Sequence, residues 1–317
     1  MKYAIISDIQ GNNHAFKAVL ADAEANGVDK FLLLGDYTNN YSQGNDVVNA
    51  IRKLSSAVVI RGNGESDIIS LRGVSVQQQT YEQLKPLYWV YRNLSQVNHK
   101  FLAKLPATAE VEDSGKTIYL EHFMSLFNRT PVIELFDSRH YRLLMTNESF
   151  SHEDYLLFAR AIFLSCPGVL DEIVPMPEGV YLFGHNHLQF HMEYEGRLFI
   201  NPGSCGDPLN WDTRAAYTIL SLDDFGWKVD ERRVEYDLKL VDKELDISGY
   251  TEYAPMWSKL IKMQVKSAKD YYRPFMAHLI ETGLKRVEYT QPLSNDVWEE
   301  AVATWDPDKV LDSRAKI

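Results

Sequence analysis

Polar side chains with metal-binding chemistry follow several apolar, strand-like runs of this chain. Every one of them is a carboxylate, an amide or an imidazole, and none is Lys or Arg. Bringing such groups together is unfavourable unless a cation lies among them. Oxygen and imidazole ligands in combination suit Mn²⁺, Fe, Zn²⁺ or a similar ion. In chain order the residues are Asp8, Gln10, Asp36, Asn63, His122, His185 and His187.

Each of these motifs is weak by itself. An Asp after a strand is often a turn former or a helix cap, and a lone His is more often a core residue. His185 and His187 are more specific, because residues two apart in an extended segment face the same side. The stronger signal is the ordered combination, since five strand ends in succession carry a suitable ligand type. The remaining histidines outside the C-terminal segment are expected at the surface: His14, His99, His140, His152 and His191.

The first 65 residues contain the elements that must position the earliest of these side chains. Two apolar runs, residues 2–7 and 30–36, each stop at an Asp or just before one, and a third run follows at residues 56–65. Between these runs the apolar residues have helical spacing, which predicts a helix in each gap. Asn12 or Asn13 is expected to cap the first helix, and Gly27 to end it. This order predicts a parallel sheet covered on both faces. Ligands of such sheets bind beyond the carboxyl ends of the strands.

The rest of the chain alternates between helical and strand-like segments. Residues 79–105 are helical and rich in aromatic side chains, and a hairpin turns at residues 113–115. A helical stretch at 131–166 precedes further strands, and from residue 238 the pattern is helical again, which predicts an appended layer or a lid. Its aromatic residues are expected to pack in a core, with the wall of a substrate pocket as the alternative. These are Trp257, Tyr271, Tyr272 and Phe275.

Composition narrows the classes of function. The chain of 317 residues is 45% hydrophobic, which is enough for one large core with a smaller appendage. It has no apolar run of about 18 residues that would indicate a membrane span, and its N-terminal strand pattern is too short for a signal peptide. Two cysteines, Cys166 and Cys205, do not indicate a disulfide framework, so a cytoplasmic location is expected. A net charge of −11 disfavours a large nucleic-acid partner but not a small phosphorylated substrate.

Six segments resemble, in order and spacing, the motifs of the calcineurin-like metallophosphoesterases. They are SDIQGN, GDYTNN, RGNGE, EHF, GHNH and NPGSCGDP, and the resemblance covers about residues 1–220. It implies an α/β fold, a four-layer αββα sandwich with helical insertions and a helical C-terminal extension. We therefore expect a core of residues 1–237, with insertions at about 66–105 and 131–176. The extension of residues 238–317 is expected to pack on this core.

The resemblance also implies a role for each residue. Asp8, Gln10 and His187 would hold one metal ion, and Asn63, His122 and His185 a second, with Asp36 bridging both. Mn²⁺ is the first expectation, and Fe, Zn²⁺, Ni²⁺ or Mg²⁺ are alternatives. A hydroxide between the two ions would hydrolyse a phosphoester, and a phosphodiester is favoured over a monoester. The residues expected to take part in catalysis are Asp36, Asn63 and His122.

The sequence departs from the family pattern at two positions. Gln10 stands where a His is usual, and a Gln carbonyl is a weaker ligand for Zn²⁺ or Fe than imidazole. Gly64 stands where a His usually contacts the phosphoryl group, and the lost general-acid help is typically worth about 10²–10⁴ in rate. Substrates with good leaving groups are therefore expected. His14 and Arg61 are the nearest substitutes in the sequence.

Two other functions remain open from the sequence. Gln10 and Gly64 are compatible with a degenerate relative that binds metal or a nucleotide without turnover, as a sensor or scaffold. A nuclease on the same fold is the other alternative, and the acidic net charge together with the lack of a basic stripe counts against it.

Overall fold

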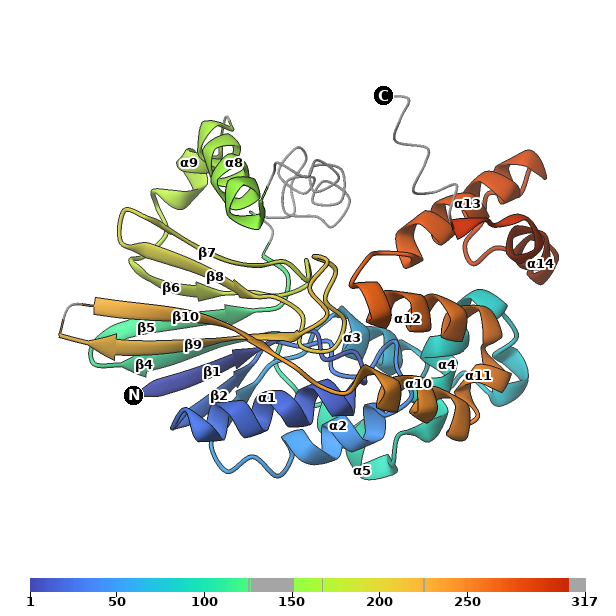
Figure 1. Ribbon diagram of the computed structural model, residues 1–317, viewed down its shortest axis with the longest axis horizontal. Helices are drawn as coiled ribbons and strands as arrows, with labels where there is room; N and C mark the ends of the chain where they lie inside the picture. The colour runs from blue at the N-terminus through green and yellow to red at the C-terminus, as the bar shows by residue number, and fades with distance from the viewer. Residues whose placement is uncertain (125, 127–150, 167, 225, 308–317) are drawn as a thin grey trace.

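The chain folds into two β-sheets packed face to face, with helices on both outer faces (Figure 1). The computed structural model describes residues 1–124, 126, 151–166, 168–224 and 226–307. The expected αββα sandwich is confirmed, and helices cluster beyond one end of the strands. Among the described helices, none is long and apolar enough to cross a membrane.

The first sheet has the strand order β10-β9-β1-β2-β3. Its three N-terminal strands are parallel, as predicted, because helices α1 (Asn13–Ala25) and α2 (Gly44–Ile51) connect them. The sheet is mixed overall, since β9 pairs antiparallel with β1 and β10 pairs antiparallel with β9. The strands are β1 (Lys2–Ile6), β2 (Lys30–Leu33), β3 (Ala57–Val59), β9 (Ala215–Asp223) and β10 (Gly226–Val234).

The second sheet has the order β4-β5-β6-β8-β7. The predicted hairpin joins its first two strands and turns at Ser114 and Gly115, both with positive φ. β5, β6 and β8 run parallel, so their carboxyl ends lie at the same edge. The strands are β4 (Thr108–Asp113), β5 (Lys116–Glu121), β6 (Gly179–Leu182), β7 (Gln189–Tyr194) and β8 (Arg197–Pro202).

Three apolar layers hold the sandwich together. Ile5, Leu120 and Ile200 belong to the layer between the sheets, where each fully buried aliphatic side chain contributes about 1.5–3 kcal/mol. The outer face of the first sheet packs on α1 and α2. The outer face of the second packs on α8 (His152–Ser165) and α9 (Val169–Ile173). Part of the expected 131–176 insertion, residues 131–150 with His140, lies outside the described residues.

Helix α1 shows how the sequence fixes the first loop of the site. Asn12 caps the helix, its side-chain oxygen accepting a hydrogen bond from the backbone N–H of Ala15 at 3.1 Å. Phe16 and Val19 are fully buried against the sheet. Gly27 adopts φ +65°, the left-handed conformation that ends the helix. The cap therefore determines where the loop of residues 7–11 must close.

Helices from two distant parts of the sequence cover the carboxyl ends of the strands (Figure 1). Those on the N-terminal side are α3 (Asn63–Ser70) and α4 (Lys85–Asn93), while α5 (Gln96–Leu102) packs against α2 instead. Those of the C-terminal extension are α10 (Leu238–Ile247), α11 (Tyr250–Tyr253), α12 (Pro255–Ser267), α13 (Tyr272–Lys285) and α14 (Asn295–Thr304). Trp89 on α4 packs edge-on against Tyr250, with ring centroids 5.3 Å apart. The extension thus packs on the first insertion, while the domain boundary after residue 237 stays a prediction.

Candidate metal centre

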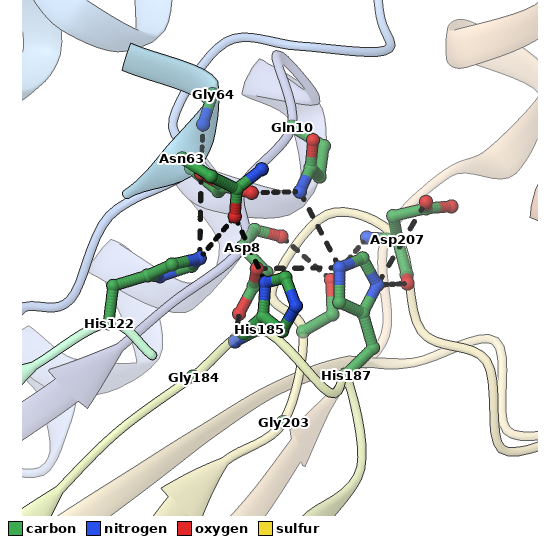
Figure 2. A network of polar contacts seen from close by, with 12 residues as sticks. Asp8, Gln10, Asn63, Gly64, His122, Gly184, His185, His187, Gly203 and Asp207 are labelled. Atoms are coloured by element: carbon green, nitrogen blue, oxygen red, sulfur yellow. Dashed lines mark hydrogen bonds and ion pairs between the residues drawn. The ribbon is translucent and has the colours of Figure 1, made fainter. Parts of the chain in front are cut away.

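The structure brings all seven predicted site residues into one connected network at the carboxyl ends of the strands, and Figure 2 labels all of them except Asp36. Asn63 is the first residue of the helix that follows β3, and the others come from the loops that follow β1, β2, β5 and β6. Hydrogen bonds and ion pairs divide them into two groups, which meet at the Asp36 carboxylate and at Asp8, whose Oδ2 accepts from the backbone N–H of His185 at 3.0 Å.

The first group consists of Asp8, Gln10 and His187. Nε2 of His187 lies 3.3 Å from Oδ1 of Asp8 and 3.5 Å from Nε2 of Gln10. The Gln10 amide also donates to Oδ2 of Asp36 at 3.3 Å. These are the residues that the resemblance assigns to one metal ion.

The second group consists of Asn63, His122 and His185. Oδ1 of Asn63 lies 3.1 Å from Nε2 of His122 and 3.0 Å from Nδ1 of His185. Nε2 of His122 lies 3.5 Å from Oδ1 of Asp36. Asp36 therefore contacts one group through each of its two oxygens, which is the arrangement that a bridging carboxylate requires.

Left-handed backbone conformations direct five of these side chains into the network. Non-glycine residues rarely adopt positive φ, and each such conformation costs about 1–3 kcal/mol. Such strain persists where the surrounding structure enforces it, and it clusters at functional sites. The residues and their φ values are Asp8 (52°), Gln10 (57°), Asp36 (53°), His185 (69°) and His187 (60°).

Backbone carbonyls fix the orientation of two imidazoles. Nδ1 of His122 lies 2.9 Å from the carbonyl oxygen of Leu34, and Nδ1 of His187 lies 2.7 Å from that of Asp207. A neutral ring that donates from Nδ1 leaves the Nε2 lone pair directed into the network. This is the usual support for a histidine that binds a metal ion.

The donor set fits a divalent cation. Oε1 of Gln10 is buried and has no hydrogen-bond partner among the described residues, and Oδ1 of Asp8 has only the ion pair with Nε2 of His187 at 3.3 Å. Ligand atoms of Asp8, Asp36 and His122 all lie within 4.8 Å of one another, and all three residues are buried. Buried carboxylates this close repel each other strongly unless positive charge lies between them. The residues present therefore suit the metal ions that the sequence predicts, although each ligand role stays a prediction.

Opposite charges dominate the titration of the buried groups. Burial alone would lower the pKa of His122, but the carboxylates of Asp36 and Asp8 raise it to about 10. Burial would likewise lower the pKa of His187, and Asp8 raises it to about 9. In turn, the positive charges of His187 and His122 hold the pKa of Asp8 well below its ordinary value, although complete burial acts to raise it. His185 differs, because burial and the neighbouring His122 lower its pKa.

These shifts predict that metal binding releases protons. In the metal-free protein the His187 imidazole keeps its proton up to about pH 9, and a cation must displace it because only neutral imidazole binds metal. Affinity for Mn²⁺ should therefore rise with pH between about 6 and 9. Calorimetric titration at pH 7.5 in two buffers of different ionisation enthalpy would count the protons. His187→Ala should reduce the number released by about one, whereas His185→Ala should leave it unchanged, because His185 is already neutral. Equal counts for both variants would contradict the assignment.

The site depends on two residues to which the sequence analysis gave no role. Glu65, in the RGNGE segment, is fully buried and accepts hydrogen bonds at 2.9 Å from the backbone N–H groups of Asp36, Tyr37 and Gly62. Asp207, in the NPGSCGDP segment, accepts at 3.0 Å from the Tyr41 hydroxyl. Both residues lie in motifs of the family resemblance, and this was the sequence signal that could have identified them.

The loop at residues 201–208 lies directly beneath the site. Its Ser204 hydroxyl donates to the Asp8 carbonyl at 2.7 Å, and the N–H of Gly206 donates to the same oxygen at 3.1 Å. Cys205 is fully buried, and burial raises the pKa of its thiol. The loop therefore fixes the backbone of Asp8, and Cys205 packs in the core between the first sheet and its helices.

A cavity of about 330 Å³ opens over the network. The first insertion contributes Gln83, Leu84, Pro86 and Leu87 to its wall, and the C-terminal extension contributes Trp257, Gln264, Asp270, Tyr272 and Arg273. The expectation of a core position is confirmed for Trp257, which is buried in the core of the extension and also lines the cavity, and is wrong for Tyr272, which is exposed. Trp257 near the start of α12 and Tyr272 at the start of α13 lie side by side at the cavity, with ring centroids 5.3 Å apart. Tyr271 and Phe275 do pack in the core of the extension.

The two residues proposed as substitutes for the missing family His lie elsewhere. Neither His14 nor Arg61 is among the residues that line the cavity. The other histidines expected at the surface divide into two kinds. His191 is exposed, whereas His14, His99 and His152 are partly buried.

Comparisons with known proteins agree with this fold. A family model described as calcineurin-like phosphoesterase matches residues 1–200. The uncharacterised protein MJ0912 of Methanocaldococcus jannaschii is 27% identical over 251 residues, which are 74% of this chain and 88% of that protein. A metallophosphoesterase from Sphaerobacter thermophilus has a similar structure, with a TM-score of 0.56, 20% identity, and coverage of 84% of this chain and 99% of that one. The hypothetical protein PH1004 of Pyrococcus horikoshii gives a TM-score of 0.58 at 15% identity, covering 85% and 99%. Because the family model spans more than half of the sequence, this chain belongs to the calcineurin-like phosphoesterase family.

Proposed function

We propose that this protein is a metal-dependent hydrolase that cleaves a small phosphodiester with two divalent cations, Mn²⁺ being the first expectation. The observation that carries the proposal is the position of Asp36 between the two ligand groups. Two cations held there would lower the pKa of a water molecule between them and neutralise charge on the phosphoryl oxygens.

The cavity wall favours this chemistry over covalent catalysis by an aliphatic hydroxyl, thiol or amine nucleophile. Among the described residues, the lining contains no Ser, Thr, Cys or Lys that could act in this way. The protein's own contribution would then be to hold the ligands rigidly and to position the substrate. His122 and His187, fixed through Nδ1 by backbone carbonyls, and Asp8, fixed by the loop below, perform the first task.

Charge and size favour a small diester. The lining carries the carboxylates of Asp36, Asp67, Asp207 and Asp270, and Arg273 is the one Lys or Arg that the structure places in it. A phosphodiester has a single negative charge, so this acidic wall repels it less than a dianionic monoester. The volume of about 330 Å³ suits a small molecule rather than a polynucleotide.

Hydrolysis of two model substrates tests the proposal. Protein loaded with Mn²⁺ should hydrolyse bis-p-nitrophenyl phosphate faster than p-nitrophenyl phosphate, and excess chelator should remove both activities. Activity that is indifferent to chelator would contradict metal dependence. A faster monoester reaction would contradict the substrate class.

The degenerate relative remains the second candidate because of Gln10 and Gly64. Gln10 directs its Nε2 donor toward Asp36 and His187, and its carbonyl oxygen has no hydrogen-bond partner among the described residues. Metal analysis separates the candidates. Two tightly held ions per chain would support the hydrolase, whereas one ion or none, without turnover across a substrate panel, would support a binding role.

Replacing Gln10 with His should strengthen the first metal site. Imidazole is a better ligand than an amide for Zn²⁺ and Mn²⁺, and His tolerates the left-handed backbone at this position. We expect at least about tenfold tighter Zn²⁺ binding, equivalent to about 1.4 kcal/mol. Gln83→His is the matched control, because it adds an imidazole to the cavity wall away from the ligand network. Equal gains in the two variants, or no gain in Gln10→His, would show that residue 10 does not contact the metal.

A further inference from the structure

Asn39 has an unused side-chain amide at the edge of the metal centre. It lies three residues after Asp36, in the loop that follows β2, and lines the cavity together with Asp36 and Asn63. Its Oδ1 atom is buried without a hydrogen-bond partner, and its Nδ2 donor bonds to no other described residue. Nδ2 is therefore free to donate to an acceptor from outside the chain, while Oδ1 requires a donor such as water.

The glycine at position 64 makes room for this amide. A Cβ atom on Gly64 would overlap the Nδ2 and Oδ1 atoms of Asn39. Gly64 is not among the residues with positive φ, so its backbone conformation does not require glycine. Its N–H donates to Oδ1 of Asp36 at 2.7 Å. The Asn39 amide therefore occupies the space that a side chain at position 64 would fill, directly beside Asp36.

The loop that carries Asn39 is held on its C-terminal side. The N–H groups of Asn40 and Tyr41 donate to the Gln10 carbonyl at 3.0 and 2.8 Å. The Tyr41 hydroxyl and the Asn40 amide both donate to the side chain of Asp207. The loop is thus bound both to Gln10 and to Asp207, whose carbonyl orients His187. Because the loop is held in place, the Asn39 amide needs little reorganisation to bind a ligand.

We propose that Asn39 contacts the substrate, its Nδ2 donating a hydrogen bond to a phosphoryl oxygen of the ester bound over Asp36. This deepens the proposed function and rests on it. An amide cannot give up a proton, so Asn39 stabilises charge on the phosphoryl group and leaves the departing oxygen unprotonated. The site consequently requires esters with good leaving groups.

Asn39→Ala tests the proposal in the Mn²⁺-loaded protein. Loss of one such donor typically costs about 10²–10³ in rate, so kcat/KM for bis-p-nitrophenyl phosphate should fall about 10²-fold. Affinity for inorganic phosphate, measured by calorimetry, should fall as well, while Mn²⁺ affinity and Tm stay at their wild-type values. Asn40→Ala is the matched control, since Asn40 lines the same cavity but already bonds to Asp207. Its phosphate affinity should remain unchanged.

The outcomes separate this inference from the function on which it rests. If the wild type hydrolyses the diester and Asn39→Ala retains both the rate and the phosphate affinity, the inference is overturned and the function stands. If the wild type hydrolyses nothing, the proposed function fails, and the phosphate titration still decides whether Asn39 binds the anion.

A second variant tests the steric relation. Gly64→Ala should displace the Asn39 amide and lower phosphate affinity to the level of Asn39→Ala. The double variant should lose no more than either single variant, because both changes remove the same contact. Additive losses would show that position 64 acts independently of Asn39 and would overturn the proposal.

Discussion

Asp36→Asn is expected to abolish hydrolysis, lowering kcat/KM at least about 10³-fold, or about 4 kcal/mol of transition-state stabilisation. The Asp36 carboxylate contacts side chains of both ligand groups, one through each oxygen. An amide in its place keeps an oxygen for the Gly64 N–H but loses the negative charge that offsets repulsion between two cations. We therefore expect fewer than two ions per chain in the variant, measured by native mass spectrometry alongside the kinetics.

Asp67→Asn is the control for this prediction. Asp67 lines the same cavity, so the substitution makes the same change of charge without touching the ligand network. It should retain two ions and most of the activity. Wild-type turnover by Asp36→Asn, with its ions lost, would show that the reaction does not depend on the metal centre. Equal losses in both variants would show that the charge of the cavity, rather than the position of Asp36, is what matters.

The site could be predicted from the sequence because each predicted ligand directly follows an apolar, strand-like run. A buried strand is readable from its apolar run, and parallel strands place their carboxyl ends at one edge. Asp8 and Asp36 needed no further information to be brought together once the parallel N-terminal strands were predicted, whereas His122, which follows a strand of the second sheet, was placed with them by the family resemblance. The same local logic accounts for the Asn12 cap, which depends on a residue three positions away, but not for the contact between Ser204 and Asp8, which are 196 positions apart.

What the sequence could not predict depends on contacts between distant segments. Trp257 and Tyr272 have the spacing of ordinary core residues, and only the packing of the extension on α4 places them at the cavity. Asn39 is likewise an ordinary loop residue until the space above Gly64 is known. Left-handed backbone at five site residues is enforced by the surrounding structure and has no sequence signal of its own.

Glu65→Ala is expected to lower the free energy of unfolding by about 3–5 kcal/mol, since each buried donor left without a partner costs about 1–3 kcal/mol. Three backbone N–H groups lose their acceptor, those of Asp36, Tyr37 and Gly62. Burial and the charge of Asp36 raise the pKa of Glu65 to about 7, while the backbone hydrogen bonds act in the opposite direction. Its position is thus explained by the donors that it satisfies rather than by any charge partner.

Urea unfolding in the presence of chelator measures this effect without a contribution from bound metal. Glu24→Ala, an exposed position on α1, is the control and should change stability by no more than about 0.5 kcal/mol. Glu65→Gln should fall between the two, because its remaining oxygen can still accept from Asp36 and Gly62 while its NH₂ group faces the Tyr37 donor. Wild-type stability in Glu65→Ala would mean that water replaces the carboxylate, and Asp36 would then be held by its own loop. The expected order of stabilities would instead show that Glu65 joins the loop after β2 to the start of α3. These two segments, which carry Asp36 and Asn63, would then unfold together.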